Sequence, residues 1–243
     1  MSATAVRLAF LRSCRALSGE FGDLEAVMDW FAAKDRERRF EVRRVPLAAL
    51  GQWTYVPDPL RLVHRSGRFF SIEGIRVETS FGPTASWDQP IINQPEVGIL
   101  GLLAREIDGV LHFLMQAKME PGNVNILQLS PTVQATHSNY SRVHQGNAPH
   151  YLEYFTEPGR ARVLLDQLQP EQGARFLSKR NRNMVVAVDG PVPMHEDCRW
   201  LTLGQIKALL AHDNIVNMDA RVGLSLIPLA DPDEPPDYGM IDG

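Results

Sequence analysis

The sequence predicts an α+β fold, in which a mixed or antiparallel β-sheet is flanked by helices. Helical periodicity occurs near the two ends of the chain, and alternating or β-branched runs fill much of the stretch between Val42 and Pro228. The composition agrees with a folded protein, because 243 residues with 44% hydrophobic and 22% charged side chains can bury a substantial core. A disordered chain and a collagen-like chain are therefore excluded.

The first predicted element is an N-terminal helical segment, residues 1–41. Within it, Phe21, Leu24, Met28 and Phe31 recur at steps of three and four residues, which places them on one face of a helix. Charges of alternating sign follow them, as is typical of a solvated helix face.

Strand-forming residues begin at Val42. Three turn pairs separate alternating or apolar runs and predict β-hairpins: Ser66-Gly67, Glu73-Gly74 and Asp108-Gly109. Further strand-like runs cover residues 40–47, 124–136 and 182–190. We find no internal repeat and no linker in this stretch, so residues 42–230 are predicted to form one module.

A helix is predicted again near the end of the chain. Thr202 precedes an apolar run and Gln205 follows three residues later, which is the pattern of a capping box. The acidic, proline-rich tail of residues 231–243 is expected to be disordered.

Composition and missing motifs exclude several classes of function. The formal net charge of −4 argues against a basic surface for nucleic acid. Cys14 and Cys198 form neither a disulfide framework nor a zinc pattern. Glycine motifs for dinucleotides and nucleoside triphosphates are absent, and the scattered histidines show no metal-ligand spacing, so neither cofactor nor metal is expected. No apolar run is long enough to span a bilayer, and an arginine-broken N-terminal run does not support a secretory signal. A soluble, cytoplasmic protein without a membrane partner is the expectation.

One strand-rich segment, residues 115–140, carries an unusual number of polar side chains. Along a regular strand Gln116, Lys118 and Glu120 share a face, and Gln134 and Thr136 share another with their alternate neighbours. Amides, hydroxyls, a lysine and a carboxylate suit a polar neutral ligand such as a sugar. A solvent-facing side of a sheet would carry similar residues, so both interpretations stay open.

A second segment, residues 171–184, is basic and rich in amides. Arg175, Lys179 and Arg182 lie near Asn183, and such cations beside amides suit a diphosphate. The alternative is a solvated basic loop before a strand.

Two tryptophans, Trp53 and Trp87, lie near glutamines and prolines, with Gln89 close to the second. They are candidates for a stacking wall against a base or sugar ring, or else simply buried side chains.

Taken in order, several motifs give a specific resemblance. They are Trp53, HRSGRFFSI (64–72), WDQPII (87–92), EPGN (120–123), LSPTVQATHSNY (129–140), EQGARF (171–176), KRNRNM (179–184) and DNIVNMDAR (213–221). In this order and spacing the chain resembles the NDP-hexose 2,3-dehydratase family of deoxysugar biosynthesis, from about Val42 to Pro228.

The resemblance implies a Nudix-like fold and a nucleoside-diphosphate 4-keto-6-deoxyhexose as substrate, usually linked to thymidine. It implies loss of the C2 hydroxyl as water to give a 3,4-diketo sugar. The Nudix metal helix is not found, because residues 104–109 begin like it but lack the following carboxylate pair, which leaves a divalent metal without ligands. Family members usually carry two such modules in tandem, and this chain has one. A homodimer replacing the tandem pair is one explanation, and a catalytically silent module that binds nucleotide sugar and partners a second module is the other.

Site roles follow from the resemblance and from the reaction, which needs a base at C3 and an acid at the C2 hydroxyl. The predicted catalytic residues are Lys118, Glu120, His137 and Tyr140, with acid and base left open between them and a packed strand end as the alternative for the last two. The predicted substrate-binding residues are Trp53, Phe70, Trp87, Gln89, Gln116, Gln134, Thr136, Asn139, Arg175, Lys179, Arg182 and Asn183.

Overall fold

The computed structural model describes residues 2–37, 39–136 and 149–230. The helices are α1 (Ala3–Arg15), α2 (Leu24–Glu37), α4 (Glu153–Thr156), α5 (Leu203–Leu209) and α6 (Met218–Ser225), with a short 3₁₀ turn at Leu47–Ala49. The strands are β1 (Trp53–Pro57), β2 (Leu60–His64), β3 (Ser71–Glu78), β4 (Ser86–Asn93), β5 (Gly98–Ile107), β6 (Val110–Met119), β7 (Leu127–Ser130), β8 (Val133–Ala135), β9 (Arg162–Pro170), β10 (Arg180–Val188) and β11 (Cys198–Thr202).

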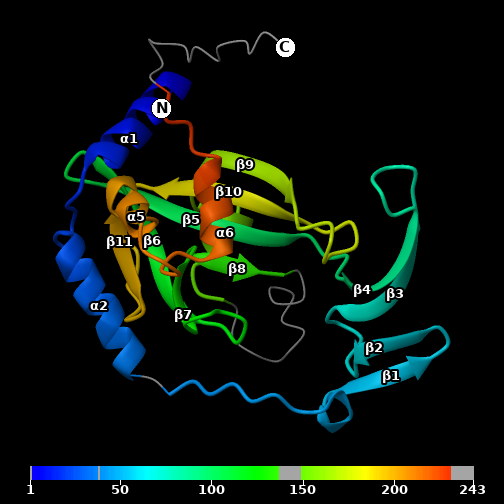
Figure 1. Ribbon diagram of the computed structural model, residues 1–243. Helices are drawn as coiled ribbons and strands as arrows, with labels where there is room; N and C mark the ends of the chain where they lie inside the picture. Colours follow the sequence, from blue (N-terminus) through cyan, green and yellow to red (C-terminus); the bar gives the residue numbers. More distant parts are fainter. Residues whose placement is uncertain (1, 38, 137–148, 231–243) are drawn as a thin grey trace.

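A seven-stranded sheet forms the centre of the protein (Figure 1). Its main order is β11-β6-β5-β10-β9, and β7 and β8 add to β6 and β5. β10 runs parallel to β5, whereas the other pairings of this sheet are antiparallel. The predicted α+β class with a mixed sheet and flanking helices is therefore confirmed.

Local signals at two positions explain how the chain enters this sheet. The predicted hairpin at Asp108-Gly109 joins β5 to β6, and both residues have the positive φ that a tight hairpin turn requires. The predicted capping box begins α5: the Thr202 hydroxyl accepts from the Gln205 N–H at 3.1 Å, and the Gln205 side-chain oxygen accepts from the Thr202 N–H at 3.0 Å. Both predictions are confirmed.

The predicted strand over 124–136 is two strands instead of one. Pro131 separates β7 from β8, and proline lacks the N–H that a continuous ladder needs. The chain changes partner at this point, because β7 pairs with β6 while β8 pairs with β5. Thr132 secures the change: its hydroxyl donates to the Leu114 carbonyl at 2.5 Å and accepts from the Leu103 N–H at 2.9 Å.

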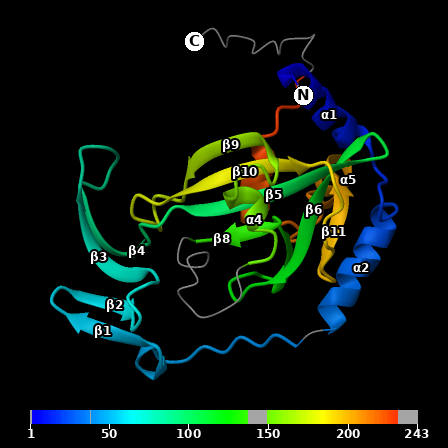
Figure 2. The same cartoon turned by 180° about the vertical axis from the view of Figure 1, so that it is seen from behind.

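The core lies on both faces of the central sheet. One face is covered by α1, α2, α5 and α6, whose buried side chains Phe10, Phe31, Ile206 and Ala220 belong to one cluster with Leu102. The other face is covered by α4, as the reverse view shows (Figure 2), and Tyr151, Leu152 and Phe155 pack there against Leu103 and Leu114. The predicted N-terminal helical segment thus packs into this core, and the division of the chain at residues 41 and 230 stays a prediction.

Strands β1–β4, residues 53–93, form a separate antiparallel sheet that we call the arm (Figure 1). Ile91 is its single buried side chain among the strand residues, all of which the structure describes. The arm meets the body where the Ile92 N–H donates to the Arg175 carbonyl at 2.9 Å. The predicted turn at Glu73-Gly74 is wrong, because both residues lie inside β3 and the β3–β4 connection follows Thr79.

The predicted strand over residues 40–47 is also wrong. Residues 40–46 have no regular structure, and Leu47 begins a 3₁₀ turn, so this stretch connects α2 to the arm. None of the helices in the described ranges has the length and apolar character that crossing a bilayer requires.

Candidate functional site

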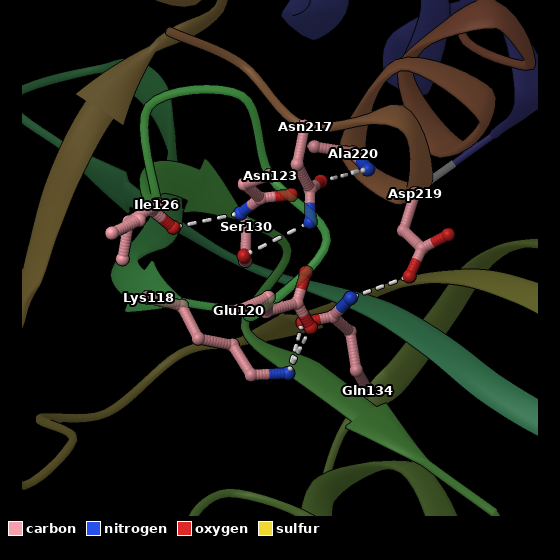
Figure 3. A network of polar contacts seen from close by, with 9 residues as sticks. All are labelled: Lys118, Glu120, Asn123, Ile126, Ser130, Gln134, Asn217, Asp219 and Ala220. Carbon is pink, nitrogen blue, oxygen red and sulfur yellow. Dashed lines mark hydrogen bonds and ion pairs between the residues drawn. The ribbon is translucent and has the colours of Figure 1, made fainter. Parts of the chain in front are cut away.

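A network of charged and amide side chains lies where β6, β8 and α6 meet (Figure 3). The Lys118 ammonium donates to the Gln134 side-chain oxygen at 2.6 Å and pairs with the Glu120 carboxylate at 2.9 Å. The Gln134 side-chain nitrogen donates in turn to the Asp219 carboxylate. Side chains from two parts of the polar segment thus meet Asp219, which lies on the last helix. The Gln134 amide is fixed in one orientation, because its oxygen accepts from Lys118 and its nitrogen donates to Asp219.

The start of α6 positions Asp219. Asn217, which is buried, accepts from the Ala220 N–H at 2.8 Å and caps the helix. Its side-chain nitrogen donates to the Ser130 hydroxyl at 3.0 Å, and its backbone N–H donates to the Leu129 carbonyl at 2.9 Å. Asn217 therefore ties the start of α6 to β7, two residues before Asp219, the residue that binds Gln134.

Two cavities meet at Gln134. The larger, of about 410 Å³, is lined by Gln116, Lys118, Gln134, His150, His195 and their neighbours. The smaller, of about 250 Å³, is lined by Gln134, Thr136, Lys179, Asn181, Asp219 and their neighbours. The wall of the larger cavity is polar and apolar in nearly equal parts, whereas that of the smaller is mainly apolar. A few polar side chains on such walls can fix the orientation of a bound ligand.

Burial changes the proton affinity of two groups in the smaller cavity. It raises the pKa of the Asp219 carboxyl, an effect that the Gln134 hydrogen bond and the Lys118 charge oppose and the Glu120 charge reinforces. It lowers the pKa of the Lys179 ammonium, against the opposing charges of Glu171 and Glu96. Lys179 donates to the Glu96 carbonyl, so its position is fixed by the backbone.

The wall of the larger cavity contains a cluster of rings and a thiol. The His150 and His195 rings lie 3.6 Å apart between centroids, and Tyr151 meets His195 edge-on at 5.3 Å. The Tyr151 hydroxyl donates to the Pro193 carbonyl at 2.9 Å and accepts from the His195 N–H at 3.0 Å. Burial raises the pKa of the adjacent Cys198 to about 11, so this thiol stays protonated at neutral pH.

The structure brings together five predicted site residues of the polar segment, and Lys179 from the basic segment joins two of them at the smaller cavity. Gln116 and Lys118 lie on one face of β6, Glu120 follows that strand, and Gln134 and Thr136 lie on and after β8. His137, Asn139 and Tyr140, which the same polar segment contributes to the prediction, lie outside the described residues.

The three predicted diphosphate cations do not converge. Lys179 lines the smaller cavity, but Arg182 is bound through two nitrogens to the Asp166 carboxylate, and Arg175 is exposed in the loop before β10. Alternate side chains of a strand point to opposite faces, so Arg182 faces away from buried Asn181 and Asn183. Of this predicted group, Lys179 lines the smaller cavity together with Asn181, and its role as a diphosphate ligand stays a prediction.

The predicted aromatic wall is divided across the arm. Trp53, on β1, contacts His64 at 5.4 Å and Phe70 at 4.8 Å, and these residues form a cluster of their own. Trp87, on β4 at the other edge, donates to Gln89 at 2.9 Å. Gln89 donates to the Ala174 carbonyl at 3.0 Å and thereby contacts the loop before β10. The two tryptophans do not form a common wall within this chain, because β2 and β3 lie between their strands.

Sequence reasoning missed His150, Tyr151 and His195 as members of the site. Asp219 was inside a motif of the resemblance, DNIVNMDAR, but no role followed from the motif alone. A signal for Tyr151 is absent from the sequence, because its positive φ of 67° is a property of the folded backbone. Within the described ranges, no three side chains of the metal-binding types converge on a common point.

Comparison with known proteins gives the chain a family. A family model described as NDP-hexose 2,3-dehydratase matches residues 24–227. A protein of Saccharopolyspora spinosa, named dTDP-4-dehydro-6-deoxy-alpha-D-glucopyranose 2,3-dehydratase, is 59% identical over 202 residues, which cover 83% of this chain and 42% of that protein. Proteins of the same name from Amycolatopsis orientalis and Streptomyces violaceoruber are each 52% identical, over 85% and 82% of this chain and 45% of theirs.

The chain thus spans somewhat less than half the length of these relatives. Among solved structures, a crystal structure of an ADP compounds hydrolase aligns with a TM-score of 0.42 and 14% identity, over 66% of this chain and 85% of that one. The match of the family model covers most of the chain, including the strands and the helix that build the polar network at Gln134. The chain therefore belongs to the NDP-hexose 2,3-dehydratase family.

Proposed function

We propose that this protein eliminates water across C2 and C3 of a thymidine-diphosphate-linked 4-keto-6-deoxyhexose. The family and the names of the relatives support the reaction class. The observation that carries the proposal is the Lys118–Gln134–Asp219 network, which lies on the walls of two adjoining cavities. A ketosugar needs such a set of fixed donors and acceptors, because each of its oxygens loses hydration on binding.

The chemistry defines what the side chains must do. The C4 ketone acidifies the C3–H bond, and a base removes that proton to leave an enolate. The electron pair then forms the C2–C3 double bond while the C2–O bond breaks, and protonation turns the departing hydroxyl into water. Tautomerisation of the resulting enol gives the 3,4-diketo-2,6-dideoxy sugar. The enolate oxygen needs a positive donor, and the C3 proton needs a basic oxygen.

Lys118 and Glu120 are our proposed pair for the first half of this reaction. Their charged groups are 2.9 Å apart, and both side chains are about one-third exposed. Lys118 lines the larger cavity and Glu120 lies beside it, so both would lie next to a substrate bound there. Glu120 would accept the C3 proton and Lys118 would donate to the enolate oxygen. Gln116, Gln134 and Thr136 would bind the hexose and Lys179 the diphosphate, since these side chains line the two cavities.

We further propose that a second copy of the chain completes the assembly as a homodimer. The arm supports this, because an antiparallel sheet usually covers at least one of its faces, whereas the arm leaves Tyr55, Phe69 and Trp87 exposed.

The elimination is tested by incubating the protein with thymidine-diphosphate-4-keto-6-deoxyglucose and an aromatic diamine, which traps adjacent ketones. We expect a trapped sugar that has lost one water, detected by mass spectrometry. Thymidine diphosphate binding without consumption of the ketosugar would instead identify a silent nucleotide-sugar-binding module.

A further inference from the structure

We propose that His195 is the acid that protonates the departing C2 hydroxyl, and that His150 and Tyr151 hold its ring in place. This assignment rests on the proposed dehydration and extends it to the second half of the reaction. The three rings lie on the wall of the larger cavity. Their proposed role is to give a proton, whereas the Lys118–Glu120 pair removes one.

The reaction needs two separate proton carriers. The base that removes the C3 proton cannot at the same moment give a proton to the C2 hydroxyl, because the two groups act in opposite directions. Lys118 is already engaged by the Glu120 carboxylate and the Gln134 amide. Histidine can give or accept a proton near neutral pH, and His195 lines the same cavity as Lys118 and Gln134.

His195 is held more firmly than an ordinary loop residue. It lies between β10 and β11, yet its backbone N–H donates to the Tyr151 hydroxyl at 3.0 Å. That hydroxyl is fixed at 2.9 Å by the Pro193 carbonyl. The Tyr151 ring meets the His195 ring edge-on, and the His150 ring lies against the His195 ring, tilted by 34°, at 3.6 Å between centroids. The ring is therefore restricted before any substrate arrives, as a catalytic acid requires.

The backbone at Tyr151 gives independent support. Its φ of 67° lies in the left-handed region, which is unfavourable for a bulky aromatic residue. Strained residues persist when the surrounding structure fixes them, and they cluster at functional sites. Here the strained conformation places the Tyr151 ring in the core while its hydroxyl reaches His195 and the preceding His150 ring faces the cavity.

The two halves of the reaction can be measured separately in deuterated water. Removal of the C3 proton and its return from solvent puts deuterium into recovered substrate, whereas elimination gives the trapped diketone. We expect His195→Asn to lower elimination by about 100-fold or more, since general acids contribute on the order of 100-fold to 10,000-fold. Exchange at C3 should continue in this variant, because the Lys118–Glu120 pair is intact.

His150→Phe keeps a ring against His195 and should lower elimination less than His150→Ala does, again with exchange retained. His212→Asn, an exposed histidine after α5, is the matched control and should behave as the unsubstituted protein does. Thermal unfolding and thymidine diphosphate binding check that each variant is folded, and His195→Gln serves if His195→Asn is not.

Elimination by His195→Asn at the rate of the unsubstituted protein would overturn the assignment. An equal loss of exchange and elimination would also overturn it, because His195 would then act in removal of the C3 proton. Failure of the proposed function is distinct from both, because the unsubstituted protein would then neither exchange the C3 proton nor form the diketone.

Discussion

Lys118→Met should lower the rate of elimination by about 100-fold or more, and it should abolish exchange at C3 as well. The ammonium is the single donor that links the Glu120 carboxylate, at 2.9 Å, to the Gln134 amide, at 2.6 Å, among the described contacts. Without it the enolate oxygen has no positive partner, and Gln134 loses the contact that fixes its amide. Methionine has a similar length, so the cavity wall keeps its shape. The rates of deuterium uptake and of diketone formation test this prediction.

Lys207→Met is the matched control, because Lys207 is exposed in the last turn of α5. Turnover of Lys118→Met at the rate of this control would show that the network is not where the proton is removed.

The titration of the Asp219 carboxyl is a second measurement of the same substitution. The Lys118 charge lowers its pKa, so removing that charge should raise the pKa further, and the carboxyl should titrate at higher pH in the variant when followed by carbon NMR.

Gly204→Ala should lower the free energy of unfolding by about 1–3 kcal/mol or more, as overpacking in a core does. A Cβ atom at Gly204 would lie 2.2 Å from the Ala16 carbonyl oxygen and 2.7 Å from the Cys14 carbonyl oxygen. Both are backbone atoms at the end of α1, so the helix itself would have to move away from α5. Urea unfolding followed by circular dichroism measures the change.

The matched control is Gly190→Ala, where a Cβ atom meets nothing within 4 Å and the backbone φ suits alanine. This substitution should leave stability unchanged or raise it by about 0.4–1 kcal/mol, because alanine restricts the unfolded chain. Equal stabilities of the two variants would mean that α1 does not pack on α5 as closely as the structure has it.

Local patterns predicted the local parts of the fold. The Asp108-Gly109 hairpin and the Thr202–Gln205 capping box were predictable because each depends on residues within one turn of backbone. The Glu73-Gly74 turn prediction was wrong because it too used only local sequence. A Glu-Gly dipeptide can lie in a strand as well as in a turn, and here both residues pair with β4. The switch of the chain at Pro131, from pairing with β6 to pairing with β5, was not predictable, because it depends on where two other strands lie.

The site was predictable only along one segment. Strand alternation placed Gln116 and Lys118 on one face, and their common cavity agrees with that. Asp219 and His195 enter from segments far along the chain, and pattern alone cannot tell which distant residues the topology brings together. Arg182 shows the converse. Its charge suggested that it binds phosphate, but it is already bound by the carboxylate of Asp166 on the neighbouring strand β9.

The most direct measurement is a crystal structure of the protein with thymidine-diphosphate-glucose, which lacks the C4 ketone and so remains intact. We expect the hexose to lie between Lys118 and His195, with hydroxyl groups bound to Gln134 and C3 turned toward Glu120. A hexose bound elsewhere, with the Lys118–Gln134–Asp219 contacts exposed to solvent and away from the ligand, would contradict the assignment of this network as the place where water is eliminated.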